Sequence, residues 1–187
     1  MEHPPKIACS PLSDSGVNNG ESRCVSLIGM PGSGKSTLAQ ELSRSLQWPW
    51  LDTDHLLEAW FGVSLETLKN RVGLEQFLLC EEEIILDLWV RRCIVATGGS
   101  VVYSDAAMRH LQNRGPVVYL QADPEVISSR VAQNPDRGLV MRPDQDLAQI
   151  YAERTPLYEA YADLVINTAE NGLHDCVQRI ARYMELA

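Results

Sequence analysis

Short apolar runs alternate along the chain with longer segments in which apolar residues recur every three or four positions. Short runs are typical of buried strands, and the spacing of three and four is typical of helices that bury one face. The pattern predicts strands at about residues 24–28, 48–51, 93–97, 117–120 and 164–167. It predicts helices at about residues 37–46, 64–90 in two segments, 104–113, 123–132, 147–161 with a break near Thr155 and Pro156, and 172–186. This alternation predicts an α/β fold whose parallel sheet is covered by helices on both faces.

Residues 1–22 do not share this pattern. They contain several Pro, Gly, Ser and Asn residues and few large apolar side chains, a mixture that does not offset the entropy of ordering. We therefore expect a flexible tail, with an arm packed on a partner subunit as the alternative. The remaining residues, 23–187, have the length of one domain.

Composition narrows the classes of partner. The formal charge of −9 argues against a nucleic-acid surface, because phosphate backbones are bound by clustered Lys and Arg. Five scattered cysteines without C-x-x-C spacing predict neither a disulfide framework nor a zinc site. No apolar run has the length of a membrane span, and no signal peptide is recognisable. We expect a cytoplasmic protein, a monomer or weak dimer, whose partner is a small molecule.

Residues 29–36 match the phosphate-binding pattern G-x-x-x-x-G-K-[ST] between a predicted strand and a predicted helix. Glycines let backbone N–H groups turn toward a phosphate, Lys35 reaches the β and γ oxygens, and Ser36 coordinates Mg²⁺. The start of the helix adds its dipole. The pattern predicts ATP or GTP binding by Gly32, Ser33, Gly34, Lys35, Ser36 and Thr37.

Asp52 and Asp54 follow the predicted strand at 48–51. In open α/β sheets ligands bind beyond the carboxyl ends of the strands, so these acids should face the same crevice as the phosphate loop. Asp52 would then serve Mg²⁺ and Asp54 an acceptor hydroxyl. The alternative is that either residue only caps a helix.

Two further segments carry candidate chemistry. Gly98 and Gly99 follow the strand at 93–97, where they permit close approach of a ligand to the backbone or form a simple turn. The segment between Gln133 and Asp144 is rich in helix breakers and carries Arg137 and Arg142. Arginines on a hinged segment neutralise charge and exclude water in phosphoryl transfer, so this segment is predicted to be a mobile lid.

From about Val25 to Tyr183 the chain resembles the shikimate kinases, a family of small P-loop kinases. The phosphate loop is specific by itself, and the other motifs gain specificity from their order. In sequence these are the phosphate loop at 29–37, Leu-Asp-Thr-Asp at 51–54, Gly-Leu-Glu-Gln-Phe at 73–77 leading to Glu81, Gly98-Gly99, Arg130, Arg137-Gly-Leu, and Arg154-Thr-Pro-Leu-Tyr.

The resemblance implies a P-loop fold with a five-stranded parallel sheet, a lid that closes over ATP, and transfer of the γ-phosphoryl group to a ring hydroxyl of shikimate. It implies that Arg130 stacks on adenine and that Asp52 supports Mg²⁺ through water. The implied catalytic residues are Lys35, Asp54 and Arg137, with Arg137 at the transferred group. For the acceptor it implies Asp54 at the hydroxyl, Gly98 and the Gly99 N–H beside it, and Arg154 at the carboxylate.

The chain departs from the family pattern mainly in the acceptor motifs. Leu78 stands where the family has an arginine that helps to hold the shikimate carboxylate, Ser100 replaces a glycine, and Gly138 replaces a lid proline. Arg71 or Arg142 could supply the missing cation. Two alternatives stay open: a hydroxy amino acid such as homoserine as the acceptor, or a regulatory module that binds nucleotide without an acceptor.

Overall fold

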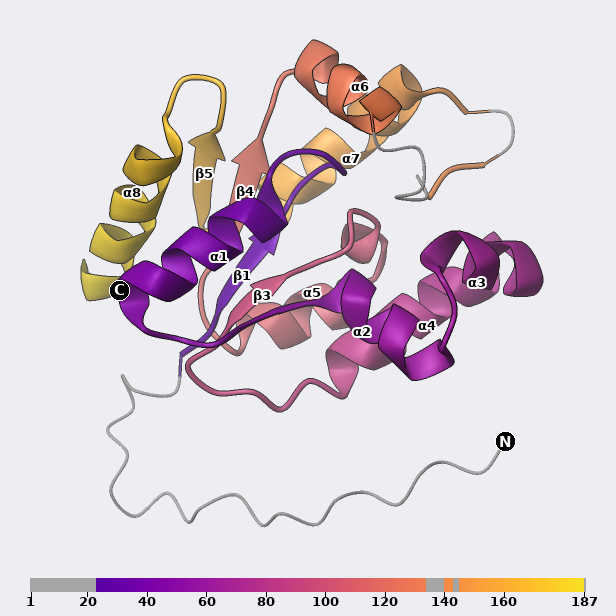
Figure 1. Cartoon of the computed structure of the whole chain (residues 1–187), viewed down its shortest axis with the longest axis horizontal. Coiled ribbons are helices and arrows are strands. Elements are labelled where there is room, and N and C mark those ends of the chain that lie inside the picture. The colour runs from indigo at the N-terminus through magenta and orange to yellow at the C-terminus, as the bar shows by residue number, and fades with distance from the viewer. Residues whose placement is uncertain (1–22, 134–139, 143–144, 187) are drawn as a thin grey trace.

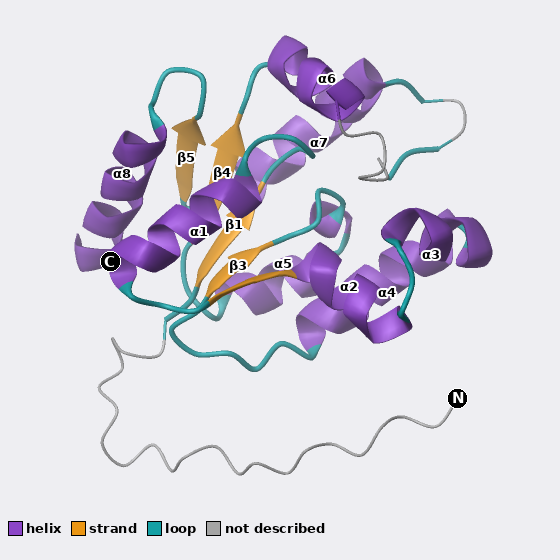
Figure 2. Ribbon diagram, viewed as in Figure 1, coloured by secondary structure: helices purple, strands orange, loops and turns teal. Residues whose placement is uncertain are grey.

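A five-stranded parallel sheet forms the centre of the computed structural model, which describes residues 23–133, 140–142 and 145–186 (Figures 1 and 2). The strand order is β2-β3-β1-β4-β5, and each pair of neighbours is parallel. The strands are β1 (Val25–Ile28), β2 (Trp50–Asp52), β3 (Ile94–Ala96), β4 (Val117–Gln121) and β5 (Leu164–Asn167).

Helices cover both faces of the sheet. Helices α1 and α8 lie side by side on the face toward the viewer in Figure 1, and α5 and α7 lie behind the strands. Helices α2, α3 and α4 pack on one another beside the β2 edge. The bounds are α1 (Lys35–Leu46), α2 (Thr53–Phe61), α3 (Leu65–Val72), α4 (Leu74–Leu86), the short 3₁₀ helix η1 (Val101–Tyr103), α5 (Asp105–Gln112), α6 (Pro124–Gln133), α7 (Leu147–Tyr161) and α8 (Leu173–Leu186).

The three central strands, β1, β3 and β4, are buried on both faces, which explains why they read as apolar runs. On one face Leu27 packs with Leu38 of α1 and Ile180 of α8. On the other face Ile28 packs in a cluster that includes Met108 of α5 and Ile150 of α7. The two apolar clusters hold the carboxyl ends of the strands at one edge of the sheet.

Strand β1 lies between β3 and β4. Strands β2 and β3 therefore lie on one side of β1, and β4 and β5 lie on the other. A crevice forms outside the carboxyl ends of parallel strands where the order reverses in this way. The loop after β1 is the phosphate loop, and the ends of β2 and β3 lie next to it. Local sequence and topology thus bring the predicted motifs to one place.

The five strands lie within two residues of their predicted bounds, whereas the helices differ more. Helix α2 and η1 were not predicted, and α4 ends at Leu86 rather than near Val90. The predicted break at Pro156 was wrong, because α7 is continuous. A proline inside a helix costs roughly 3 kcal/mol. Buried side chains on both sides of it, Ile150, Arg154 and Tyr158, hold the helix together.

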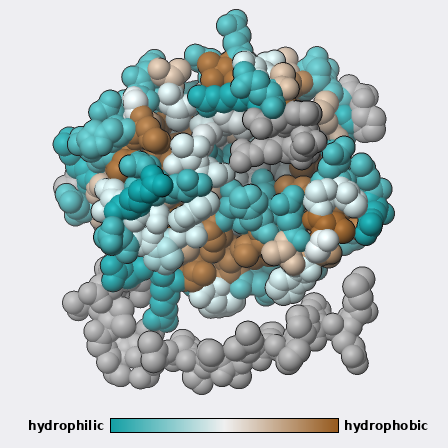
Figure 3. Space-filling model, in the orientation of Figure 1, coloured by the Kyte–Doolittle hydropathy of each residue, from teal (hydrophilic) through white to brown (hydrophobic). Residues whose placement is uncertain are grey.

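Hydrophilic residues cover most of the face drawn in Figure 3, and the apolar areas on it are separated by polar ones. No described helix combines the length and the apolar character needed to cross a membrane. The segment 1–22, expected to be a tail, lies outside the described residues, as does most of the expected lid.

Candidate active site

The phosphate loop forms a cradle between β1 and α1. Gly32 and Gly34 have φ angles of 82° and 99°, in the left-handed region that glycine adopts without strain. The Lys35 side chain is buried, and its Nζ donates to the carbonyl oxygens of Gly29 at 2.8 Å and Met30 at 2.9 Å. The ammonium group therefore lies along the loop, at the N-terminus of a helix, where an anion is favoured.

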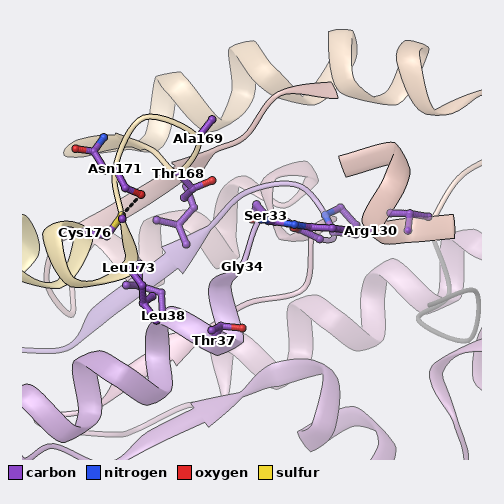
Figure 4. Close-up of a pocket in the computed structure, with 15 residues that line it drawn as sticks. Ser33, Gly34, Thr37, Leu38, Arg130, Thr168, Ala169, Asn171, Leu173 and Cys176 are labelled. Carbon is purple, nitrogen blue, oxygen red and sulfur yellow. Dashed lines mark hydrogen bonds between the residues drawn. The ribbon is translucent and has the colours of Figure 1, made fainter. Parts of the chain in front are cut away.

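A cavity of about 700 Å³ opens beside this loop (Figure 4). Its other walls include Arg130 of α6 and the segment 168–173, which joins β5 to the first residue of α8. Arg130 Nη1 donates to the Gly32 carbonyl oxygen at 2.8 Å, so the guanidinium lies against the loop. A cavity of this size holds a small molecule or a nucleotide base and sugar. The segment 168–173 was not predicted as part of the site, because nothing in its residues signals a ligand.

Ser36 and Asp52 meet where α1 faces the end of β2. The Ser36 hydroxyl donates to Asp52 Oδ2 at 2.6 Å, and Asp52 Oδ1 accepts from the Asp54 N–H at 3.0 Å. Asp52 thus caps α2, as one of the two sequence interpretations expected, while its other oxygen accepts from Ser36. Its role at Mg²⁺ stays a prediction. A hydroxyl and a carboxylate are ligands that suit Mg²⁺, whose other ligands are commonly water and phosphate oxygens.

A second cavity, of about 120 Å³, adjoins the phosphate loop on the side of α2 and α4. Pro31, Gly32 and Lys35 line it on the loop side, so a molecule here would lie against the phosphates of a nucleotide. Its opposite walls come from α2, α4, the end of β3 and α7: Asp54, Phe77, Glu81, Gly99, Ser100 and Arg154. We call it the acceptor cavity.

Arg154 is a buried cation of the acceptor cavity, with 1% of its surface exposed. Its Nε donates to the Tyr103 hydroxyl at 3.1 Å and its Nη2 donates to the Val140 carbonyl. Its Nη1 is buried and has no hydrogen-bond partner among the described residues. Buried donors are nearly always paired, so an unpaired guanidinium nitrogen at a cavity wall indicates an anionic ligand.

Neighbouring atoms leave little room for a side chain at Gly98 or Gly99. A Cβ atom on Gly98 would lie 2.3 Å from Glu81 Oε1 and 2.7 Å from Asp54 Oδ1, and one on Gly99 would lie 2.7 Å from Pro31 Cδ. The Gly98 N–H already donates to Thr53 Oγ1 at 3.0 Å. Gly98 therefore acts through its lack of a side chain, and Gly99 is the one of the two that lines the acceptor cavity.

Glu81 is the most perturbed carboxyl group of the site. Burial, and then the charge of Asp54, raise the pKa of Glu81 to about 8, although the Ser100 hydrogen bond, Arg154 and Lys35 act in the opposite direction. A carboxyl group with such a pKa is largely protonated at neutral pH. Perturbed pKa values of this kind cluster at functional sites.

Most of the predicted site residues lie around these two cavities. Lys35, Ser36, Asp52, Asp54, Gly99 and Arg154 line the acceptor cavity, and Gly32, Ser33, Gly34, Thr37 and Arg130 line the larger one. Arg137 lies outside the described residues. Neither proposed substitute for the missing arginine lines the acceptor cavity as described, because Arg71 is exposed at the end of α3 and Arg142 pairs with Glu153 at 3.2 Å.

The predicted site residues did not include Glu81 or Ser100. A signal for Glu81 was present, because Phe77, Glu81 and Ile85 are spaced by four residues and form the buried face of α4. Of its neighbours, Glu83 is exposed, whereas Glu82 is half-buried and accepts a hydrogen bond from the Ser104 hydroxyl. The expectation that at least two of the three acids are solvated was therefore wrong.

Comparisons with known proteins agree with this geometry. A family model described as shikimate kinase matches residues 31–185. A shikimate kinase of Paracidovorax citrulli is 39% identical over 169 residues, which are 87% of this chain and 92% of the relative. One from Cupriavidus pinatubonensis is 34% identical, over 86% of this chain and 85% of the relative.

Solved structures of shikimate kinases are also similar to this chain. The structure of shikimate kinase from Acinetobacter baumannii in complex with shikimate has a TM-score of 0.80 and 27% identity, over 87% of this chain and 93% of that one. Shikimate kinase from Aquifex aeolicus has a TM-score of 0.71 and 28% identity, over 87% of this chain and 96% of that one.

Proposed function

This chain belongs to the shikimate kinase family and is a small-molecule kinase, and we propose that it transfers the γ-phosphoryl group of ATP to a hydroxyl group of shikimate. The observation that carries the choice of acceptor is Arg154. Its buried, unpaired Nη1 at the wall of the acceptor cavity suits a carboxylate, and Asp54 lines the same cavity. An acceptor with both a carboxylate and a hydroxyl group, as shikimate has, would engage both residues.

The proposed mechanism uses position and charge more than covalent chemistry. Asp54 would orient the acceptor hydroxyl and accept its proton, while Lys35 would stabilise the charge that develops on the transferred group. Arg130 would hold the base of ATP, and Arg137 would reach the γ-phosphoryl group from the lid that the sequence predicts. The kinase domain would comprise residues 23–187.

The Ser36 and Asp52 oxygens are the proposed Mg²⁺ ligands, and their donor chemistry suits this ion. When bound, Mg²⁺ would neutralise charge on the β and γ phosphates. Lys35 and Ser36 are the first two residues of α1, so the same helix end would hold the phosphates and the metal ligand.

The test is ADP release measured with Mg·ATP and a panel of acceptors that contains shikimate, homoserine and related hydroxy acids. We expect shikimate to raise ADP release and homoserine to have no effect. A chain that hydrolyses ATP slowly and responds to no acceptor would contradict the proposal and would favour a regulatory module.

A Leu78→Arg variant tests where the acceptor carboxylate lies. Leu78 lines a cavity of about 240 Å³ that shares Glu81, Ser100 and Tyr103 with the surroundings of Arg154. An additional hydrogen bond to a charged group contributes about 1.5–3 kcal/mol, so we expect the KM for shikimate to fall by about tenfold or more. An unchanged KM would mean that the carboxylate does not lie toward Leu78.

Arg154→Met should raise the KM for shikimate by roughly 10- to 100-fold, because it removes the charged partner of the carboxylate. The affinity for ATP should change little, since Arg154 does not line the larger cavity. The matched control is Arg109→Met, which removes an exposed arginine paired with Asp105 on α5. Melting temperatures of both variants with ATP show whether the fold is kept. An unchanged KM in folded Arg154→Met would exclude Arg154 as the carboxylate ligand.

A further inference from the structure

Ser100 and Glu81 form a buried pair at the wall of the acceptor cavity. The Ser100 hydroxyl donates to Glu81 Oε2, and the two residues are 2% and 7% exposed. Both residues line the acceptor cavity and the cavity of about 240 Å³ beside Leu78, so they form the partition between the two. In the described part of the chain no ion pair reaches Glu81. A hydroxyl group, and not a cation, is its hydrogen-bonding partner.

Glu81 faces a second acid across Gly98. Glu81 Oε1 and Asp54 Oδ1 lie 2.3 Å and 2.7 Å from the same point, the position that a Cβ atom on Gly98 would occupy. Two carboxyl groups that share a site so closely resist being charged together. The geometry therefore opposes ionisation of Glu81 beside Asp54.

The other charged groups around the acceptor cavity do not outweigh the effect of Asp54 on the ionisation of Glu81. Lys35 of α1 is drawn toward the phosphate loop by its hydrogen bonds to Gly29 and Met30, and Arg154 of α7 is held by Tyr103 and Val140. His55, Glu58 and Asp52 also line the cavity. Among the described residues, α3 and α5 add no titratable side chain to its lining. The pKa of about 8 agrees with this arrangement.

We propose that Glu81 is a specificity-determining residue that binds the acceptor as a neutral carboxylic acid, held in place by Ser100. This rests on the proposed function of the site. The hydroxyl of Ser100 occupies one carboxyl oxygen of Glu81 and leaves Oε1 facing Asp54 and the cavity. The protonated acid can donate a hydrogen bond there without adding a negative charge near the acceptor carboxylate.

Ionisation of Glu81 should then weaken acceptor binding. It would place a second negative charge beside Asp54 and near the carboxylate that Arg154 is proposed to hold. If only the protonated form binds, the apparent affinity falls in proportion to the protonated fraction, by about tenfold for each pH unit above the pKa. The KM for the acceptor should therefore rise above about pH 8, while kcat changes less.

Glu81→Gln is the decisive variant, because glutamine keeps the shape and a neutral donor but cannot ionise. At about pH 7 we expect the KM of this variant for the acceptor to stay within about threefold of the value for the unmodified protein. At high pH we expect its KM not to rise. Glu81→Ala should raise the KM at about pH 7, because it removes the donor, and should likewise lack the rise at high pH. The matched control Glu83→Gln, on the exposed face of α4, should keep the rise. A glutamine variant as impaired as the alanine variant at neutral pH would show that the carboxylate is needed and would overturn the proposal.

Ser100→Ala tests the second member of the pair. The Ser100 hydrogen bond lowers the pKa of Glu81, so its removal should move the rise in KM to higher pH. A role in packing alone would change the KM by the same factor at every pH. A rise that stays at the same pH would exclude Ser100 as the partner of Glu81 in solution.

The protonation of Glu81 can also be observed without turnover. Infrared spectra recorded without acceptor should contain a protonated carboxyl band at neutral pH that is absent in Glu81→Gln and is lost above about pH 8. This readout separates the two proposals. If shikimate is not phosphorylated but the band is present, the proposed acceptor is wrong and the neutral acid remains. If the band is absent, the neutral acid is wrong whatever the acceptor is.

Discussion

Lys35→Met should lower kcat by about 10³-fold or more, the effect expected for one cation that faces a transferred phosphoryl group. Methionine fills much of the same volume, so the loss reports the charge and not an empty space. The buried Nζ now bonds the Gly29 and Met30 carbonyls, which shows that it can reach the centre of the phosphate loop. The measurement is single-turnover formation of the phosphorylated acceptor with Mg·ATP.

The control for this variant is Lys69→Met, which makes the same chemical change on α3, away from both cavities. We expect it to keep a rate within about twofold of the unmodified protein. The melting temperature of each variant shows whether the fold is retained. A folded Lys35→Met protein with an unchanged single-turnover rate would remove Lys35 from the mechanism.

Asp54→Asn should lower kcat by about 10²–10⁴-fold, the contribution of a positioned general base. Asparagine keeps the shape of the side chain, and the bond from the Asp54 N–H to Asp52 that caps α2 involves only the backbone of residue 54. The affinity for ATP should stay within about threefold, because Asp54 does not line the larger cavity. The measurements are kcat with saturating acceptor and the dissociation constant of ATP.

The same variant has a second expected effect. The charge of Asp54 raises the pKa of Glu81, so its removal should lower that pKa and move the rise in acceptor KM to lower pH. Asp87→Asn, an exposed acid at the end of α4, is the control and should leave both kcat and the pH dependence unchanged. An Asp54→Asn protein that keeps its kcat would mean that the acceptor hydroxyl needs no base from this chain.

Sequence reasoning was most successful where the signal is local. The phosphate loop needs glycines, Lys35 and Ser36 within a few residues, and the structure has the cradle that the pattern predicted. The positions of Asp52 and Asp54 followed from a general rule on the carboxyl ends of parallel strands. Both acids line the acceptor cavity.

It was less successful where packing competes with local preference. Pro156 predicted a break, but contacts of Arg154 and Tyr158 keep α7 continuous through it. Within the run of three acids from Glu81 to Glu83, local composition could not tell which acid enters the cavity. The answer depends on the face that α4 presents to α2 and η1.

The amino-acid sequence by itself determined the fold class, the phosphate loop and the family, because each depends on short motifs or on the alternation of strands and helices. Only the tertiary structure decided which charges meet in the acceptor cavity. Asp54, Glu81, Ser100 and Arg154 come from four different segments, and pKa values and unpaired donors arise from burial and distance between them. Those quantities depend on contacts between residues far apart in the chain, which no local pattern records.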